Sequence, residues 1–143
     1  MTLAYALTPA ITWTLVGPIK FLINSVRARR WAFNLVGNGG FPSNHSAVVS
    51  SMATLIALRE GISHPAFGVA VTIAFIVVID ANSLRRHVGR QAAAINLLAA
   101  ASTNSAGSAG KPLRERMGHT IVEICGGLLT GMAIAWAVNR VLG

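Results

Sequence analysis

Acidic side chains are scarce in this chain. Its 143 residues include 4 Asp and Glu against 12 Lys and Arg, which gives a formal net charge of +8. Charged residues make up 11% of the chain and hydrophobic residues 53%, whereas soluble domains are about a quarter charged. The composition therefore indicates a membrane protein. A soluble helical bundle is the alternative, but the run from Val69 to Ile79 has no polar face.

Cysteine and aromatic residues are also rare. The single cysteine, Cys125, lies in an apolar run, where it can form no internal disulfide and is expected to be a small packed residue. No Cys/His spacing indicates a zinc site, and no carboxylate cluster indicates another metal. With 6% aromatic residues and no free basic helix face, the charge does not indicate nucleic-acid binding. Anionic lipid head groups or a phosphorylated substrate explain it better.

Four apolar segments predict an all-α integral membrane bundle, in one domain over residues 1–143, with about four transmembrane helices. A full span needs about 20 residues, so the second and third segments are expected to continue into polar ends. A further helix, Leu84 to Ala101, is expected to lie at the interface or tuck against the bundle, before a flexible Gly/Ser/Ala loop over about 102–112. The four segments are Leu3–Ile23, Ser43–Leu58, Pro65–Ala81 and Thr120–Val138.

Alternating spans bring two histidine motifs to one face of the membrane. The end of the first segment, the start of the second, the end of the third and the start of the fourth share that face. It gathers His45, His119 and most of the basic residues. The positive-inside rule makes this face cytoplasmic in a multi-pass protein of the cell (inner) membrane. On the fourth segment, Gly127 and Gly131 are spaced for close helix packing.

The second of these motifs pairs an imidazole with a carboxylate. His119 and Glu123 are four residues apart and so lie one above the other on a helix. A carboxylate bonded to one imidazole nitrogen fixes the tautomer and makes the other nitrogen a better nucleophile. The alternative is that His119 caps the helix entry and Glu123 pairs with a nearby arginine.

The first motif reads Pro-Ser-Asn-His at the start of the second segment. Ser43 is predicted to cap this helix, with Asn44 and His45 in its first turn. Free backbone N–H groups at a helix start form a cradle for phosphate. His45 would then act as general acid toward a leaving oxygen. The alternative is a capped helix with an incidental histidine.

Basic side chains near these motifs are candidates for holding phosphate. Lys20 and Arg27 are seven residues apart, on one helical face, and the Arg27 fork can bind two oxygens. Their alternative role is to flank a membrane helix. Asp80 precedes Arg85 and Arg86 and is expected to pair with and orient an arginine.

Together these residues resemble the type 2 phosphatidic acid phosphatase superfamily, which also contains vanadium-dependent haloperoxidases. That pattern is Lys-x6-Arg-Pro, then Pro-Ser-Gly-His, then Ser-Arg-x5-His-x3-Asp. Here Ala28, Asn44 and Glu123 replace the family's proline, glycine and aspartate. The matching blocks are Lys20 to Arg27, Pro42 to His45 and His119 to Glu123.

The arginine of the third block is displaced in this chain. Arg114 leaves four residues before His119, where the family has five, and no serine precedes it. The counterpart of that arginine stays open among four residues: Arg114, Arg116, Arg85 and Arg86.

The chain is more similar to the divergent bacterial and plant branch of this superfamily, described as acid phosphatase/haloperoxidase-related. Its Gly-Gly-x-Pro-Ser-x-His-Ser-Ala, Asp-Ala-x-x-x-Arg-Arg and Leu-Gly-His-Thr-x-x-Glu features have counterparts here. They lie at Gly39–Ala47, Asp80–Asn96 and Met117–Glu123. The resemblance covers most of the chain, from about Lys20 to Gly131.

The resemblance implies a metal-independent reaction with no cofactor. His119 attacks phosphorus and forms a phosphohistidine, Glu123 orients it, and His45 protonates the leaving oxygen and then helps to activate water. Lys20, Arg27 and a later arginine stabilise the charged transition state, as preorganised electrostatics do in enzymes generally.

The expected activity is hydrolysis of a lipid phosphate ester or anhydride. Phosphatidic acid, phosphatidylglycerophosphate and polyprenyl diphosphates are the expected kinds of substrate. Larger relatives use a six-helix core, so a homodimer would complete the bundle. The alternatives are a catalytically inactive membrane protein that binds anionic lipid and, more weakly, a vanadium-dependent haloperoxidase.

Overall fold

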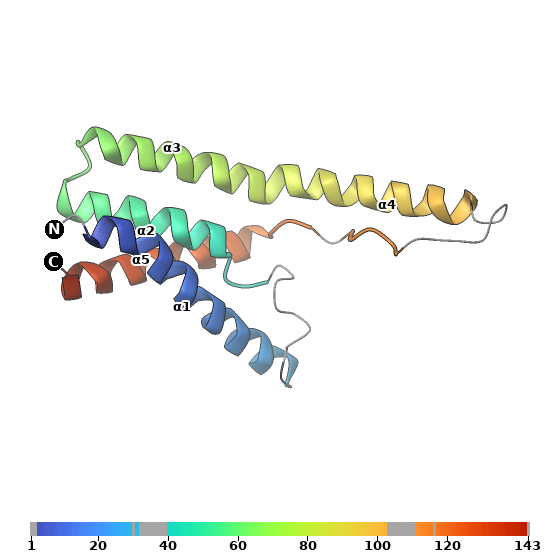
Figure 1. Cartoon of the computed structure of the whole chain (residues 1–143), viewed down its shortest axis with the longest axis horizontal. Helices are drawn as coiled ribbons and strands as arrows, with labels where there is room; N and C mark the ends of the chain where they lie inside the picture. Colours follow the sequence, from blue (N-terminus) through green and yellow to red (C-terminus); the bar gives the residue numbers. More distant parts are fainter. Residues whose placement is uncertain (1–2, 30, 32–39, 103–110, 116, 143) are drawn as a thin grey trace.

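The computed structural model describes residues 3–29, 31, 40–102, 111–115 and 117–142. These residues form helices and connections with no strand, which confirms the all-α class. Figure 1 shows the helices α1 to α5. They are α1 (Leu3–Ala28), α2 (Asn44–Arg59), α3 (Pro65–Ile79), α4 (Arg85–Ser102) and α5 (Ile121–Leu142), with a π-helical turn at Asp80–Leu84.

Three helical stretches in the described part of the chain are long and apolar enough to cross a membrane. Large apolar side chains such as Trp13, Phe75 and Leu129 are exposed along them, as contact with lipid chains requires. The protein is therefore a membrane helical bundle. The three stretches are Leu3–Ala28, Pro65–Ala101 and Ile121–Leu142.

Helix α2 is the central helix of the bundle and packs against α1, α3 and α5 (Figure 1). It has 16 residues, fewer than the about 20 that a full span requires. Its buried residues include Ser46, Ser50 and Ser51, and Thr12 Oγ1 of α1 donates to Ser51 Oγ at 2.9 Å. Of the four predicted segments, this one is enclosed by other helices.

Glycines bring α5 into backbone contact with α2. A Cβ on Gly131 would lie 2.1 Å from the Ala47 carbonyl oxygen, and one on Gly127 would lie 2.4 Å from that of Ser43. Ser50 Oγ lies 3.0 Å from the Leu128 carbonyl oxygen and donates across the interface. The close packing predicted from the two glycines is confirmed.

Helices α3 and α4 form one continuous rod (Figure 1). The helix expected to begin near Leu84 continues α3 and extends beyond the other helices, because the π turn adds a residue without breaking the backbone hydrogen bonds. The chain at residues 111–115 and at 117 runs back beside α4. Most of the predicted flexible loop, residues 103–110, lies outside the described residues.

Cys125 is exposed on α5, so its prediction as a packed residue is wrong. Its neighbours Ile124 and Gly126 are buried on the face toward the bundle. One residue of helix rotates a side chain by about 100°, which turns Cys125 away from that face.

Candidate active site

The backbone of the π turn positions His119. Its amide lies 3.0 Å from the Ala81 carbonyl oxygen and donates to it. Gly118 has φ +91, and a Cβ there would lie 3.2 Å from the same oxygen. A glycine is therefore needed before the histidine. His119 is 7% exposed and lies just before α5.

Glu123 holds the His119 ring from one turn further along. Nδ1 of His119 lies 3.0 Å from Oε2 of Glu123. The same oxygen accepts from the Thr120 amide at 3.0 Å, and the Glu123 amide donates to Thr120 Oγ1 at 3.3 Å. These reciprocal bonds form a capping box. Thr120, and not His119, thus caps α5.

The capping box was missed in the sequence reasoning, although Thr-x-x-Glu before an apolar run is its signature. It gives Glu123 a fixed position at the start of the helix. With Nδ1 of His119 directed at Glu123, Nε2 is the nitrogen left to meet a substrate.

The first histidine motif is joined to the second through the main chain. The Ser43 amide donates to the Glu123 carbonyl oxygen at 2.9 Å. Ser43 also caps α2 as predicted, since its Oγ accepts from the amide and the hydroxyl of Ser46 at 3.4 and 3.0 Å. Its hydroxyl and its amide thus both have structural partners. The alternation of helices has brought the two motifs together.

His45 lies in the first turn of α2, outside the three stretches able to span a membrane. Partial burial lowers the pKa of its imidazole, and the positive charges of Arg85, His119 and Lys20 lower it further, whereas Asp80 raises it. His45 therefore lies within electrostatic range of the second histidine motif and of two candidate phosphate-binding side chains, Arg85 and Lys20.

Asp80 positions Arg85 in this group. Nε of Arg85 lies 3.2 Å from Oδ2 of Asp80, across the π turn. Arg85 is the candidate third-block arginine whose charge acts on His45. Arg114 lies on the segment beside the outer part of α4, and Arg116 lies outside the described residues.

Lys20 acts on the site through its charge, whereas Arg27 contacts an aromatic ring that packs beside the site. The charge of Lys20 acts on both His45 and Glu123. The Arg27 guanidinium lies 5.3 Å from the centroid of the Phe41 ring, a cation–π contact. That ring packs on α5 where a Cβ at position 126 would collide with it. Arg27 is thus connected to the site through Phe41.

Asn44 occupies the position of the superfamily's motif glycine. Its Oδ1 is buried and has no hydrogen-bond partner among the described residues. A buried amide oxygen without a partner is costly, so this side chain presents an unused polar group beside His45.

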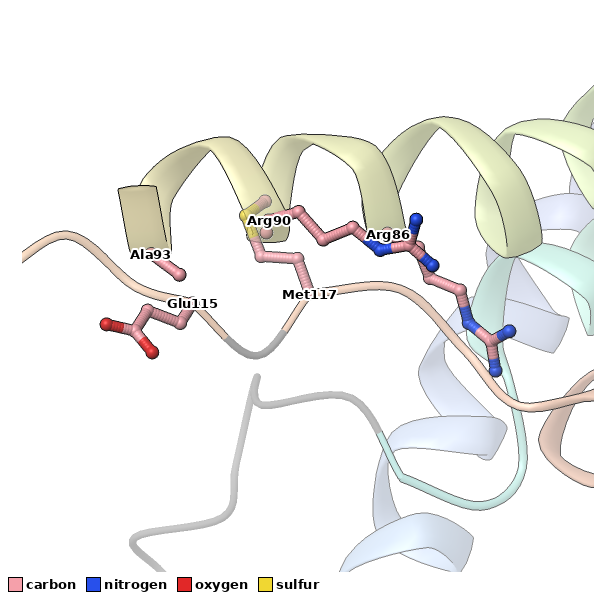
Figure 2. Close-up of a pocket in the computed structure, with 6 residues that line it drawn as sticks. Arg86, Arg90, Ala93, Glu115 and Met117 are labelled. Atoms are coloured by element: carbon pink, nitrogen blue, oxygen red, sulfur yellow. The ribbon is translucent and has the colours of Figure 1, made fainter. Parts of the chain in front are cut away.

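An open groove of about 360 Å³ lies between α4 and the residues Glu115 and Met117, with Arg86 in its lining. Figure 2 shows Arg86 extending toward the bundle, while the Glu115 carboxylate lies near Ala93 at the opposite end. Arg86 also packs on the backbone at Gly118, where a Cβ would lie 3.3 Å from its Cγ.

Known proteins similar to this chain show the family to which it belongs. The chain is 34% identical over 128 residues to the "Uncharacterized membrane protein YuiD" of Bacillus subtilis (strain 168), a match that covers 82% of this chain and 79% of that protein. No solved structure matches it. The family described as "Divergent PAP2 family" matches residues 2–134. The chain therefore belongs to the divergent PAP2 family.

Proposed function

We propose that this protein is a membrane lipid phosphatase that works through a phosphohistidine at His119. The observation that carries the proposal is the 3.0 Å contact between His119 Nδ1 and Glu123 Oε2, which leaves Nε2 as the nucleophile. The charges of Arg85, His119 and Lys20 act on His45, and the charge of Lys20 also acts on Glu123. A nucleophile, an acid and cations are the groups that metal-free phosphoryl transfer needs.

The first step transfers the phosphoryl group to the protein. His119 Nε2 forms a bond to phosphorus as the bond from phosphorus to the leaving oxygen breaks. Protonated His45 gives its proton to that oxygen, so a lipid alcohol leaves from a phosphate monoester and a lipid monophosphate leaves from a diphosphate. The Arg85 and Lys20 charges offset the negative charge that builds on the three remaining phosphoryl oxygens.

The second step restores the protein. Neutral His45 accepts a proton from a water molecule as the water oxygen attacks phosphorus. The bond from phosphorus to His119 Nε2 breaks, and inorganic phosphate leaves. Glu123 holds the ring through both steps because its hydrogen bond stabilises the positive charge that develops on the imidazole.

The substrate class follows from the position of the site. The site residues lie where α2 and α5 begin and where α3 passes into α4, beside stretches able to span a membrane (Figure 1). A lipid phosphate presents its head group at the membrane surface while its chains stay among such helices. Phosphatidic acid, phosphatidylglycerophosphate and polyprenyl diphosphates all have a terminal phosphate suited to this arrangement.

Phosphate release from these three lipids by the purified, detergent-solubilised protein, with a chelator present, tests the proposal. We expect release with at least one lipid, and a loss of about 10³-fold or more in His119→Ala. His64→Asn is the matched control, because His64 caps α3 at the other end of the bundle and asparagine is also a good cap.

Protein quenched in alkaline detergent should also carry label from a ³²P-labelled substrate, because the P–N bond of a phosphohistidine survives alkali, and that label should be absent in His119→Ala. Full activity in His119→Ala would contradict the nucleophile assignment. Binding of phosphatidic acid vesicles without any release from the three lipids would instead support an inactive lipid-binding protein. Halide oxidation by the vanadate-loaded protein, without phosphate release, would favour a haloperoxidase.

A further inference from the structure

Asn96, near the far end of α4, binds the chain that leads to His119. Asn96 Nδ2 donates to the Leu113 carbonyl oxygen at 2.8 Å and to Glu115 Oε1 at 2.9 Å. Asn96 Oδ1 accepts from the Leu113 amide at 2.8 Å. A single amide thus satisfies the donor and the acceptor of one backbone residue and also holds a carboxylate.

The segment then contacts the same rod twice more before it reaches α5. At Gly89, a Cβ would lie only 2.3 Å from the Glu115 carbonyl oxygen, so the backbone rests directly on the helix. At Ala81, the carbonyl oxygen accepts from the His119 amide at 3.0 Å. Figure 2 shows Glu115 and Met117 on this segment, facing the side of α4 that carries Arg86 and Arg90.

These three points lie on one face of the rod. Asn96 and Gly89 are seven residues apart, which is two helical turns. In a regular α-helix, the residue seven positions before Gly89, at position 82, would lie on the same face. The π turn takes up one extra residue, and so it brings Ala81 to that face instead.

The chain between the two ends of this attachment has almost no slack. From Ala81 to Asn96 the rod rises over 15 residues, or about 22 Å at 1.5 Å per residue. From Leu113 to His119 the chain has 6 residue steps and reaches at most about 22 Å when fully extended. The Asn96 anchor and the position of His119 are therefore mechanically coupled.

We propose that Asn96 is a positioning residue for His119: it holds Leu113 and Glu115 against α4 and so restrains where the imidazole stands. This inference builds on the proposed function, because its kinetic consequence concerns the nucleophile of that reaction. Without the Asn96 contacts, the chain that leads to His119 gains slack, and His119 loses one of the restraints on its position. Misplacement of a reacting group by about 1 Å can cost about 10²-fold in rate.

The kinetic test compares Asn96→Ala with Asn139→Ala in the full-length protein. Asn139 is the matched control because it also joins two elements, accepting from Arg59 Nε at 2.8 Å, but at the other end of the bundle. We expect Asn96→Ala to lower kcat and the rate of phosphohistidine formation by about 10- to 100-fold with KM changed less than about 3-fold. Asn139→Ala should leave kcat within about 3-fold of the wild type. Equal kcat losses in the two variants, or none in Asn96→Ala, would overturn the inference.

A spectroscopic test separates this inference from the proposed function. In protein with ¹⁵N-labelled histidine, the Nδ1–H of His119 should give a resonance shifted by its hydrogen bond to Glu123, whether or not the protein hydrolyses a lipid. That resonance should broaden or shift in Asn96→Ala and in Gly89→Ala, whose added Cβ pushes the segment from α4, and stay in place in Asn139→Ala. An unchanged His119 resonance in folded Asn96→Ala protein would refute the positioning role even if no activity is found.

Discussion

Glu123 serves two arrangements with one carboxylate, since Oε2 accepts both from His119 and from the Thr120 amide. Loss of this side chain would therefore affect both the first turn of α5 and the position of the His119 imidazole. The two contributions separate because a glutamine keeps an acceptor for the Thr120 amide but has no charge to stabilise an imidazolium.

Glu123→Gln should lower kcat by about 10²-fold or more, because the imidazole loses the charge that supports it, while the melting temperature changes little. Thr120→Ala should instead lower the melting temperature and change kcat little. It removes the bond from the Glu123 amide to Oγ1, costs about 1 kcal/mol of stability, and leaves kcat within a few-fold. Phosphate release and thermal unfolding, measured on both variants, check the pair. Equal effects on kcat would contradict the separate roles.

His45 should make the reaction faster in mild acid. The pKa of the His45 imidazole lies below the usual 6.5. The fraction of His45 that is protonated, and so able to donate to the leaving oxygen, therefore falls as the pH rises above this lowered pKa. We expect kcat/KM to fall about 10-fold for each pH unit between pH 7 and pH 8.5. A pH–rate profile checks this, and His45→Gln should be slow and lack this limb. A kcat/KM that rises over the same range would contradict His45 as the acid.

At the scale of elements, the contact between α2 and α5 sets the site because both histidine motifs stand at its end. The backbones approach at Gly131, so even a methyl group there must separate the helices. Gly17 offers the opposite case in α1, where a Cβ would meet nothing within 4 Å.

Gly131→Ala should lower stability by about 1 to 3 kcal/mol and reduce activity, because its Cβ meets the Ala47 backbone. Gly17→Ala should be neutral or stabilise by up to about 1 kcal/mol, since alanine is the better helix former. Thermal unfolding in detergent compares the two. A Gly131→Ala protein as stable as Gly17→Ala would show that the helices are not packed backbone to backbone.

Local spacing predicted the parts of the site that lie within one helix turn. The contact between His119 and Glu123 and the cap at Ser43 both follow from residues three or four apart. The role of Asn96 does not, because its partners lie 17 and 19 residues away and depend on how the chain returns along α4. The continuous rod was missed because the apolar run of α3 ends at polar residues, Asp80, Asn82 and Ser83, while the helical backbone continues through them as a π turn.

At the scale of the molecule, the rod of α3 and α4 is longer than a membrane is thick. Its 37 residues from Pro65 to Ala101 rise about 55 Å, against a hydrocarbon core of about 30 Å. One end must therefore reach the aqueous side or the head groups. The basic residues Arg85, Arg86 and Arg90 indicate that this is the end carrying α4.

Accessibility to a membrane-impermeant maleimide should place the two ends of the protein on opposite sides. Cys125→Ser removes the single cysteine, and new cysteines at Ile62, in the turn before α3, and at Leu98, in α4, are both at exposed positions. We expect Leu98→Cys to be labelled from the cytoplasmic side and Ile62→Cys from the other. Labelling of both from one side would contradict the topology.

The hydrogen bond from the Ser43 amide to the Glu123 carbonyl oxygen has a consequence for engineering. Main-chain atoms make it, so any residue except proline at position 43 keeps the donor. This link between the two histidine motifs therefore does not depend on the side chains of Asn44, His45 or His119. We expect those three side chains to be the positions to exchange when a different reaction is to be installed between the two helix starts.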